Sequence, residues 1–113
     1  MNTITVSFRA VDKVKFNNVC KGIKKYETRA FSPKYQKVQA GDRLIIKCGQ
    51  YKISKTIKKV YHFKSINTLL DELPLNQVMP DVKNTGEARH RWYSFPGYKD
   101  KIKKFGIVAW ELK

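Results

Sequence analysis

Two strand-like segments joined by a very short turn constrain the fold of this chain most. Residues 43–48 alternate apolar and polar side chains, and Gly49-Gln50 then forms a glycine-first loop typical of a tight hairpin. The second segment, residues 51–63, is long, and Lys55 and Lys59 interrupt its apolar face, so we expect a β-bulge near Lys58 and Lys59. We expect that face to hold Tyr51, Ile53, Ile57, Tyr61 and Phe63, with Val60 on the other. A long bent strand of this kind is what a small barrel requires.

Further strands and helices are predicted on both sides of this hairpin. Residues 3–8 alternate as a half-buried strand, and residues 105–112 are apolar on both faces, as in a central or closing strand. Helical spacing appears in residues 11–23, with Phe16, Val19, Cys20 and Ile23 on one face. A helix from Ser65 and a helix over 87–95 begin at capping residues. The fold class is therefore α+β, a small mixed β-barrel with flanking helices, in a single domain over 1–113.

The net charge of +15 on 113 residues favours polyanionic partners, with nucleic acid first. The chain shows neither a secretory leader nor a run of about 20 apolar residues, so we expect no membrane partner. Cys20 and Cys48 are expected to be reduced, buried thiols of a cytoplasmic protein. His62 and His90 stand alone, so neither a metal site nor a cofactor is predicted.

The segment from residue 22 to residue 29 concentrates ionisable side chains directly after the first helix. Gly22 can end that helix in a left-handed conformation. In a strand over 26–30, Glu27 and Arg29 would share a face with Lys25, opposite Tyr26 and Thr28. This grouping predicts either a charged site or an exposed ion pair, which would look the same in sequence.

Three other groups of residues are candidates for a binding surface. On the helix over 87–95, Arg91 and Tyr93 could contact single-stranded nucleic acid, whereas Trp92 is expected to pack that helix onto the barrel. Tyr35, in a loop over 31–40, either stacks on a ligand or anchors its own loop. A third group is expected to be a solvated loop and consists of Lys99, Lys101, Lys103 and Lys104. No triad, phosphate-binding glycine loop or metal spacing is present, so Lys24 with Glu27 is the acid–base pair to test if the protein is an enzyme.

The segment from residue 22 to residue 29, the Gly41-Asp42 that opens a strand and the late Gly-Ile-Val-Ala-Trp strand together resemble the ASCH domain, a member of the PUA-like β-barrel superfamily. The resemblance implies a cleft lined by Lys24, Glu27 and Arg29 that binds RNA or a modified nucleotide. Some members of that family are amidohydrolases acting on N4-acetylcytidine with a lysine, a threonine and a glutamate. Here Lys24 matches the lysine, but Glu27 stands at the threonine position, and Thr28 is one residue away.

Our leading hypothesis is a non-enzymatic RNA- or nucleotide-binding domain whose basic cleft uses Lys24, Lys25, Glu27 and Arg29, with Tyr35, Arg91 and Tyr93 as further contacts. The alternative is a small hydrolase of a modified nucleoside, or a ribonuclease, with Lys24 and Glu27 as acid and base. A third hypothesis is an adaptor that docks an acidic protein. We expect Arg29→Ala to weaken RNA binding without disturbing the fold.

Overall fold

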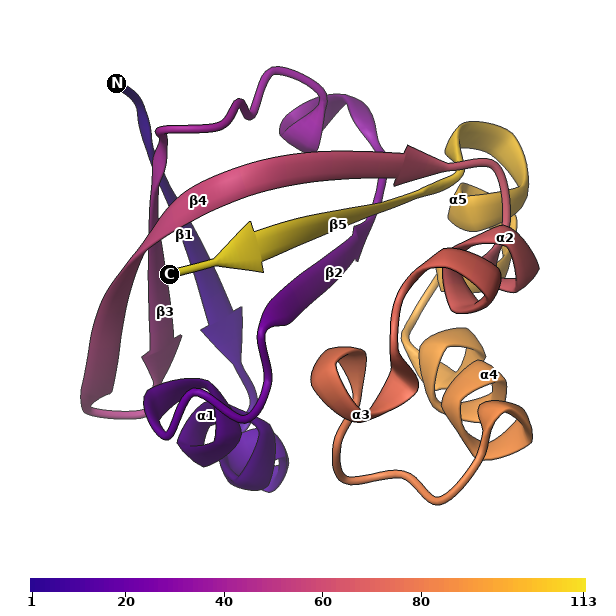
Figure 1. Cartoon of the computed structure of the whole chain (residues 1–113), viewed down its shortest axis with the longest axis horizontal. Coiled ribbons are helices and arrows are strands. Elements are labelled where there is room, and N and C mark those ends of the chain that lie inside the picture. Colours follow the sequence, from indigo (N-terminus) through magenta and orange to yellow (C-terminus); the bar gives the residue numbers. More distant parts are fainter.

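A curled sheet of five strands organises the chain, and the computed structural model describes all of residues 1–113 (Figure 1). The strands follow the order β1-β3-β4-β5-β2 across the sheet, with β1 parallel to β3 and every other pair antiparallel. Their bounds are β1 Thr3–Phe8, β2 Tyr26–Ala30, β3 Arg43–Cys48, β4 Tyr51–Phe63 and β5 Ile107–Leu112. Because β1 and β2 are the two edges and do not pair with each other, the curl is a half-barrel with an open side. The predicted α+β class with a barrel-like sheet is confirmed at this level.

Short helices flank the sheet on two sides. They are the 3₁₀ turns Ala10–Asp12 and Pro33–Tyr35 and the α-helices α1 Lys13–Cys20, α2 Ile66–Glu72, α3 Leu75–Val78, α4 Thr85–Ser94 and α5 Tyr98–Phe105. In Figure 1, α1 lies below the ends of β1 and β3, and α2 to α5 gather beside β2 and β5. The two capping predictions are confirmed, since the Ser65 side chain accepts from the Thr68 N–H and that of Asn84 from the Glu87 N–H. These caps satisfy backbone donors that a helix start leaves unpaired.

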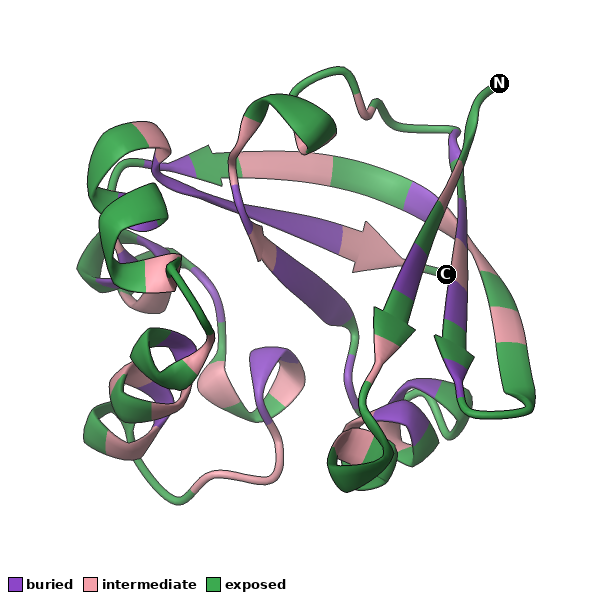
Figure 2. Cartoon of the chain, turned by 180° about the vertical axis from the view of Figure 1, so that it is seen from behind, coloured by how far each residue is buried: buried purple, intermediate pink, exposed green.

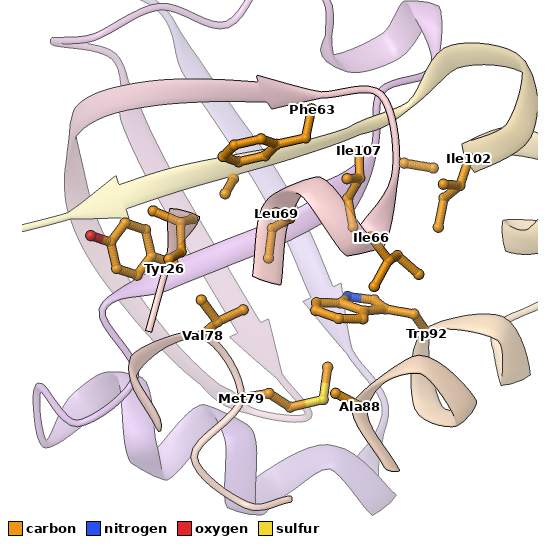
Figure 3. Close-up of a cluster of buried hydrophobic side chains, with 13 residues drawn as sticks. Tyr26, Phe63, Ile66, Leu69, Val78, Met79, Ala88, Trp92, Ile102 and Ile107 are labelled. Atoms are coloured by element: carbon orange, nitrogen blue, oxygen red, sulfur yellow. The ribbon is translucent and has the colours of Figure 1, made fainter. Parts of the chain in front are cut away.

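The two faces of the sheet border two separate apolar cores. Along β5, Val108 and Trp110 belong to the core inside the curl, whereas Ile107 and Ala109 belong to the core between the sheet and the helices. Figure 3 shows this second core, in which Trp92 of α4 points toward Ile66 and the sheet. The burial colouring of Figure 2 shows that β5 and β2 carry much of the buried surface, while the helices are exposed on their outer sides. The predicted central position of β5 and the predicted packing role of Trp92 are both confirmed.

The predicted bulge in β4 exists, but its effect on the two faces differs from our expectation. The register shifts between Ile57 and Lys59. One extra residue reverses which side each later side chain faces. Val60 therefore packs with Ile57 on the core inside the curl, whereas Phe63 belongs to the core between the sheet and the helices. The apolar residues from Tyr51 to Phe63 thus do not share one face. The same strand thus contributes to both cores.

Three local predictions were wrong in extent or type. The first helix is shorter than 11–23, and Cys20 is exposed rather than buried, while Cys48 is buried as expected. The lysine-rich segment after Gly97 is not a loop but helix α5, which buries Ile102 and keeps its lysines in solvent. None of the helices has the length and apolar character needed to cross a membrane.

Candidate ligand-binding site at the open side of the sheet

A hollow of about 270 Å³ lies where the edge strands β1 and β2 fail to meet. The end of β1 forms one wall, and β2 with the preceding Lys24 forms another. The 3₁₀ turn Ala10–Asp12, α1 and the segments around α3, α4 and α5 supply the rest of the lining. The lining consists of Ser7, Phe8, Arg9, Asp12, Lys15, Lys24, Glu27, Thr28, Arg29, Met79, Trp92, Phe95, Pro96 and Tyr98. The segment singled out in the sequence therefore borders a concave surface rather than open solvent.

The turn after α1 places β2 at this edge. Gly22 adopts a φ of +75°, a left-handed conformation that glycine takes without strain, and the N–H groups of Ile23 and Lys24 both donate to the Asn18 carbonyl. β2 then pairs with β5, so Glu27 lies opposite Trp110 and Arg29 opposite Val108. Those two partners belong to the core inside the curl, so Glu27 and Arg29 share a face, as the alternation predicted.

Glu27 and Arg29 form a nearly buried ion pair with 4% and 15% side-chain exposure. Nη1 of Arg29 donates to Oε1 of Glu27 at 2.8 Å and to the Thr28 carbonyl at 2.8 Å, and the Thr28 N–H donates to the same Oε1 at 3.0 Å. The other carboxylate oxygen, Oε2, is buried and accepts no hydrogen bond. Burial lowers the pKa of Arg29, but the charge of Glu27, with Tyr98 and Tyr35, outweighs it and raises that pKa above its usual value. The site thus holds a fixed guanidinium beside one free acceptor atom.

Lys24 is the second buried cation, with 4% of the residue exposed. Its Nζ donates to the Val78 carbonyl of α3. Burial, only partly opposed by Glu27, lowers the pKa of Lys24 below 10.5. Although both residues line the hollow, Lys24 and Glu27 form no ion pair within 4.0 Å, and the carboxylate has Arg29 as its partner instead.

Thr28 faces the helical side of β2. Its Oγ1 accepts a hydrogen bond of 2.9 Å from Nε1 of Trp92, and both side chains are buried. This bond ties α4 to the strand at the residue between Glu27 and Arg29. It also satisfies the indole N–H, which would otherwise be a buried unpaired donor.

Aromatic rings and further cations form the mouth of the hollow. The guanidinium of Arg29 lies 5.7 Å from the Phe8 ring centroid and so links the two edge strands. Nζ of Lys15 lies 4.7 Å from the Phe95 ring centroid and 3.6 Å from Asp12, and burial, again the largest influence, lowers the pKa of Lys15. The mouth therefore offers flat apolar surfaces next to positive charge.

The remaining predicted site residues do not line this hollow. Lys25 lines a separate groove. Tyr35 packs edge-on against Trp110, with ring centroids 5.5 Å apart, and thereby anchors its own loop. Arg91 pairs with Asp81 beside a second hollow. Tyr93 is 43% exposed and borders none of these three concave surfaces.

Sequence reasoning missed the walls that come from distant elements, namely Phe8, Met79, Phe95 and Tyr98. Only Tyr98 had a usable signal, because Tyr98, Ile102 and Phe105 follow helical spacing within the lysine-rich segment.

Comparisons with known proteins identify structures with the same fold but give no function. No protein-family model matches the chain, and no curated protein sequence matches it. The crystal structure of hypothetical protein PH0355 superposes with a TM-score of 0.84 at 24% identity, covering 100% of this chain and 98% of that one. The solution NMR structure of protein PF0455 from Pyrococcus furiosus gives a TM-score of 0.74 at 24% identity, covering 97% and 96%. The chain therefore shares its whole architecture with these two proteins, and identity at this level carries the fold alone.

Proposed function

We propose that this protein is a cytoplasmic, PUA-like domain of the ASCH type that binds RNA or a nucleotide by taking one unpaired base into the hollow between β1 and β2. The observation that carries the proposal is Oε2 of Glu27, a buried acceptor without a partner. An unsatisfied buried polar group costs about 1 to 3 kcal/mol, more when it is charged. A ligand that donates a hydrogen bond to this atom would recover that free energy.

A nucleobase supplies the matching groups. Its exocyclic amine or ring N–H donates to Oε2 of Glu27, and a neighbouring carbonyl or ring nitrogen accepts from Arg29, the pattern by which carboxylates and arginine read base edges. Nη1 of Arg29 already donates to Glu27 and to the Thr28 carbonyl, so its remaining N–H groups are the ones available to a ligand. The edge to be read must be unpaired, because a base within a duplex has this edge occupied.

The size and walls of the hollow fit a single base. Its volume of about 270 Å³ is just below the ~300 Å³ at which pockets for drug-sized ligands begin. Phe8, Phe95 and Tyr98 provide rings on which a base can stack, an interaction worth about 1 to 3 kcal/mol per base. The net charge of +15 draws phosphates toward the surface. The free thiols of Cys20 and Cys48 are compatible with a reducing compartment.

A second candidate function is hydrolysis of a modified nucleoside such as acetylated cytidine, or cleavage of RNA. Its support is Lys24, whose lowered pKa and buried position are typical of a lysine used in acid–base chemistry, with Glu27 in the same hollow. Turnover of acetylated cytidine or RNA that Lys24→Met abolishes would establish this function. Binding of nucleotides without any turnover would favour the first.

The proposal is tested by titrating nucleoside monophosphates into the wild-type protein and the Glu27→Gln variant at low salt, with calorimetry as the readout. Glutamine keeps the shape, and its oxygen stays with the Thr28 N–H and Arg29, so an NH₂ donor replaces the free acceptor. We expect the affinity for cytidine and adenosine monophosphates to fall about tenfold or more.

The matched control is Asp81→Asn, which alters another carboxylate with a buried unpartnered oxygen, one that lies outside this hollow. This variant should bind as the wild type does. Equal affinity of Glu27→Gln and wild type, or no nucleotide binding by either, would refute the proposal.

A further inference from the structure

A groove separate from the proposed base site carries an excess of positive charge. It is lined by Val19, Gly22, Lys24, Lys25, Lys55, Lys58, Glu111, Leu112 and Lys113. Lys24 is the only residue that lines both this groove and the base site, so the two concave surfaces adjoin at the turn that precedes β2.

The charges in this groove are poorly balanced. Its one acidic side chain, Glu111, already accepts from the Tyr61 hydroxyl at 3.2 Å and lies 3.5 Å from Nζ of Lys58. The ammonium groups of Lys25 and Lys55 make no ion pair within 4.0 Å. Lys58 itself keeps 59% of its side chain exposed. Lys25 and Lys55, together with the exposed ammonium of Lys58, are therefore available to an anionic ligand, whereas Lys24 is buried.

The other neighbour of the base site differs in charge. The second hollow shares Asp12 and Lys15 with the base site and is otherwise lined by Val11, Val14, Asp81 and Arg91. Its two carboxylates equal its two cations in number, and they form the ion pairs Asp12–Lys15 and Asp81–Arg91. A chain of phosphates leaving the base site is thus attracted toward the lysine groove and not toward this hollow.

We propose that the lysine groove holds the phosphate backbone of a single-stranded RNA whose base occupies the hollow between β1 and β2, so that the physiological ligand is an oligonucleotide and not a free nucleotide. This inference rests on the proposed function and adds the path of the strand. The RNA leaves the base site at Lys24, crosses the turn after Gly22, and places successive phosphates against Lys25, Lys55 and Lys58.

The test compares two double variants that remove the same charge. Lys55→Gln/Lys58→Gln alters the groove, and Lys99→Gln/Lys103→Gln alters exposed lysines of α5 that border neither the groove nor the base site. Each variant and the wild type are titrated, by fluorescence anisotropy and calorimetry, with an eight-nucleotide RNA, with a nucleoside monophosphate and with polyglutamate, over a range of salt concentrations.

We expect the groove variant to bind the oligonucleotide about tenfold more weakly at low salt. The slope of log affinity against log salt should fall by about 0.7 for each lysine removed. Its affinity for the monophosphate should stay within about twofold, as should both affinities of the α5 variant.

Three results would overturn the inference. Equal losses in the two variants would show only a diffuse positive field, and an oligonucleotide affinity no higher than that of the monophosphate would show that no strand follows the groove. Polyglutamate binding as tightly as RNA, with the same dependence on Lys55 and Lys58, would assign the groove to an acidic protein. In the first two cases monophosphate binding that Glu27→Gln weakens would still support the base site, so failure of the groove is distinguishable from failure of the proposed function.

Discussion

Two arginine–carboxylate pairs in this protein have similar composition but different surroundings. Glu27–Arg29 lies at the open side of the sheet with 4% and 15% side-chain exposure, and Asp81–Arg91 lies beside the second hollow with 18% and 29%. In each pair one carboxylate oxygen is buried and unpartnered. The first pair stands among aromatic walls, whereas the second faces exposed Val11 and Val14.

The difference teaches that burial on a paired strand, and not the presence of an ion pair, decides how firmly such a pair is held in one orientation. Glu27 and Arg29 are fixed by backbone hydrogen bonds within β2 and by the pairing of β2 with β5. Arg91 divides its contacts between Asp81 and, at 3.8 Å, Glu87 one turn earlier in α4, and remains close to water. A ligand group that meets the first pair finds it already oriented, which reduces the entropy lost on binding.

The largest effect is expected on the stability of the protein when the arginine of either pair is replaced. Arg29→Met should lower the free energy of unfolding by about 3 to 5 kcal/mol, because it leaves the buried Glu27 carboxylate without its partner. Arg91→Met should cost about 1 kcal/mol or less, since its pair is partly solvated. Urea unfolding monitored by circular dichroism measures both, and equal losses would remove the distinction between the pairs. Our expectation from sequence that replacing Arg29 spares the fold does not agree with this geometry.

A smaller effect is expected in the pH dependence of stability near Lys24. Burial lowers the pKa of Lys24 in the folded state, so between that value and 10.5 the unfolded chain binds more protons, and stability contributed by this group rises with pH. The free energy of unfolding of the wild type minus that of Lys24→Met should therefore become more positive as the pH rises from neutral toward 10.5. Lys15→Met should show a weaker trend of the same sign, because Asp12 at 3.6 Å favours the charged form of Lys15. A flat difference for Lys24→Met would contradict its buried environment.

The smallest effect is expected at Tyr93. Its side chain is exposed on α4 and borders neither the base site nor the lysine groove. Tyr93→Ala should change RNA affinity less than twofold and leave the melting temperature nearly unchanged, as anisotropy and thermal unfolding can show. A loss of fivefold or more would place an RNA contact on the outer surface of α4 and would count against a ligand site at the Glu27–Arg29 pair.

The sequence predicted the parts of the fold that depend on local pattern. Alternation predicted β1 and β3 and the common face of Glu27 and Arg29 on β2. Capping residues predicted the starts of α2 and α4. Local pattern was misleading at the β4 bulge, where one extra residue reverses the faces of the side chains that follow it. It was also misleading in α5, whose many lysines made an amphipathic helix resemble a solvated loop. Of the site, alternation predicted that Glu27 and Arg29 share a face, but it grouped them with Lys25, which lines another groove. Lys24, which does line the hollow, was grouped with them by the resemblance to the ASCH domain. The aromatic walls come from β1 and from the helices after Pro74, and only long-range packing brings them to β2.

The pairing of β2 has a consequence for the order in which the protein forms during synthesis. In the sheet β2 pairs only with β5, which follows it by about 80 residues and is the last strand made. Contacts between such distant residues require long loops to close and form slowly. While the chain is being translated, Glu27 and Arg29 are present early but have no neighbouring strand to hold them. A product interrupted before residue 107 would carry every side chain that lines the hollow and still lack β5, the only strand that holds β2 in place.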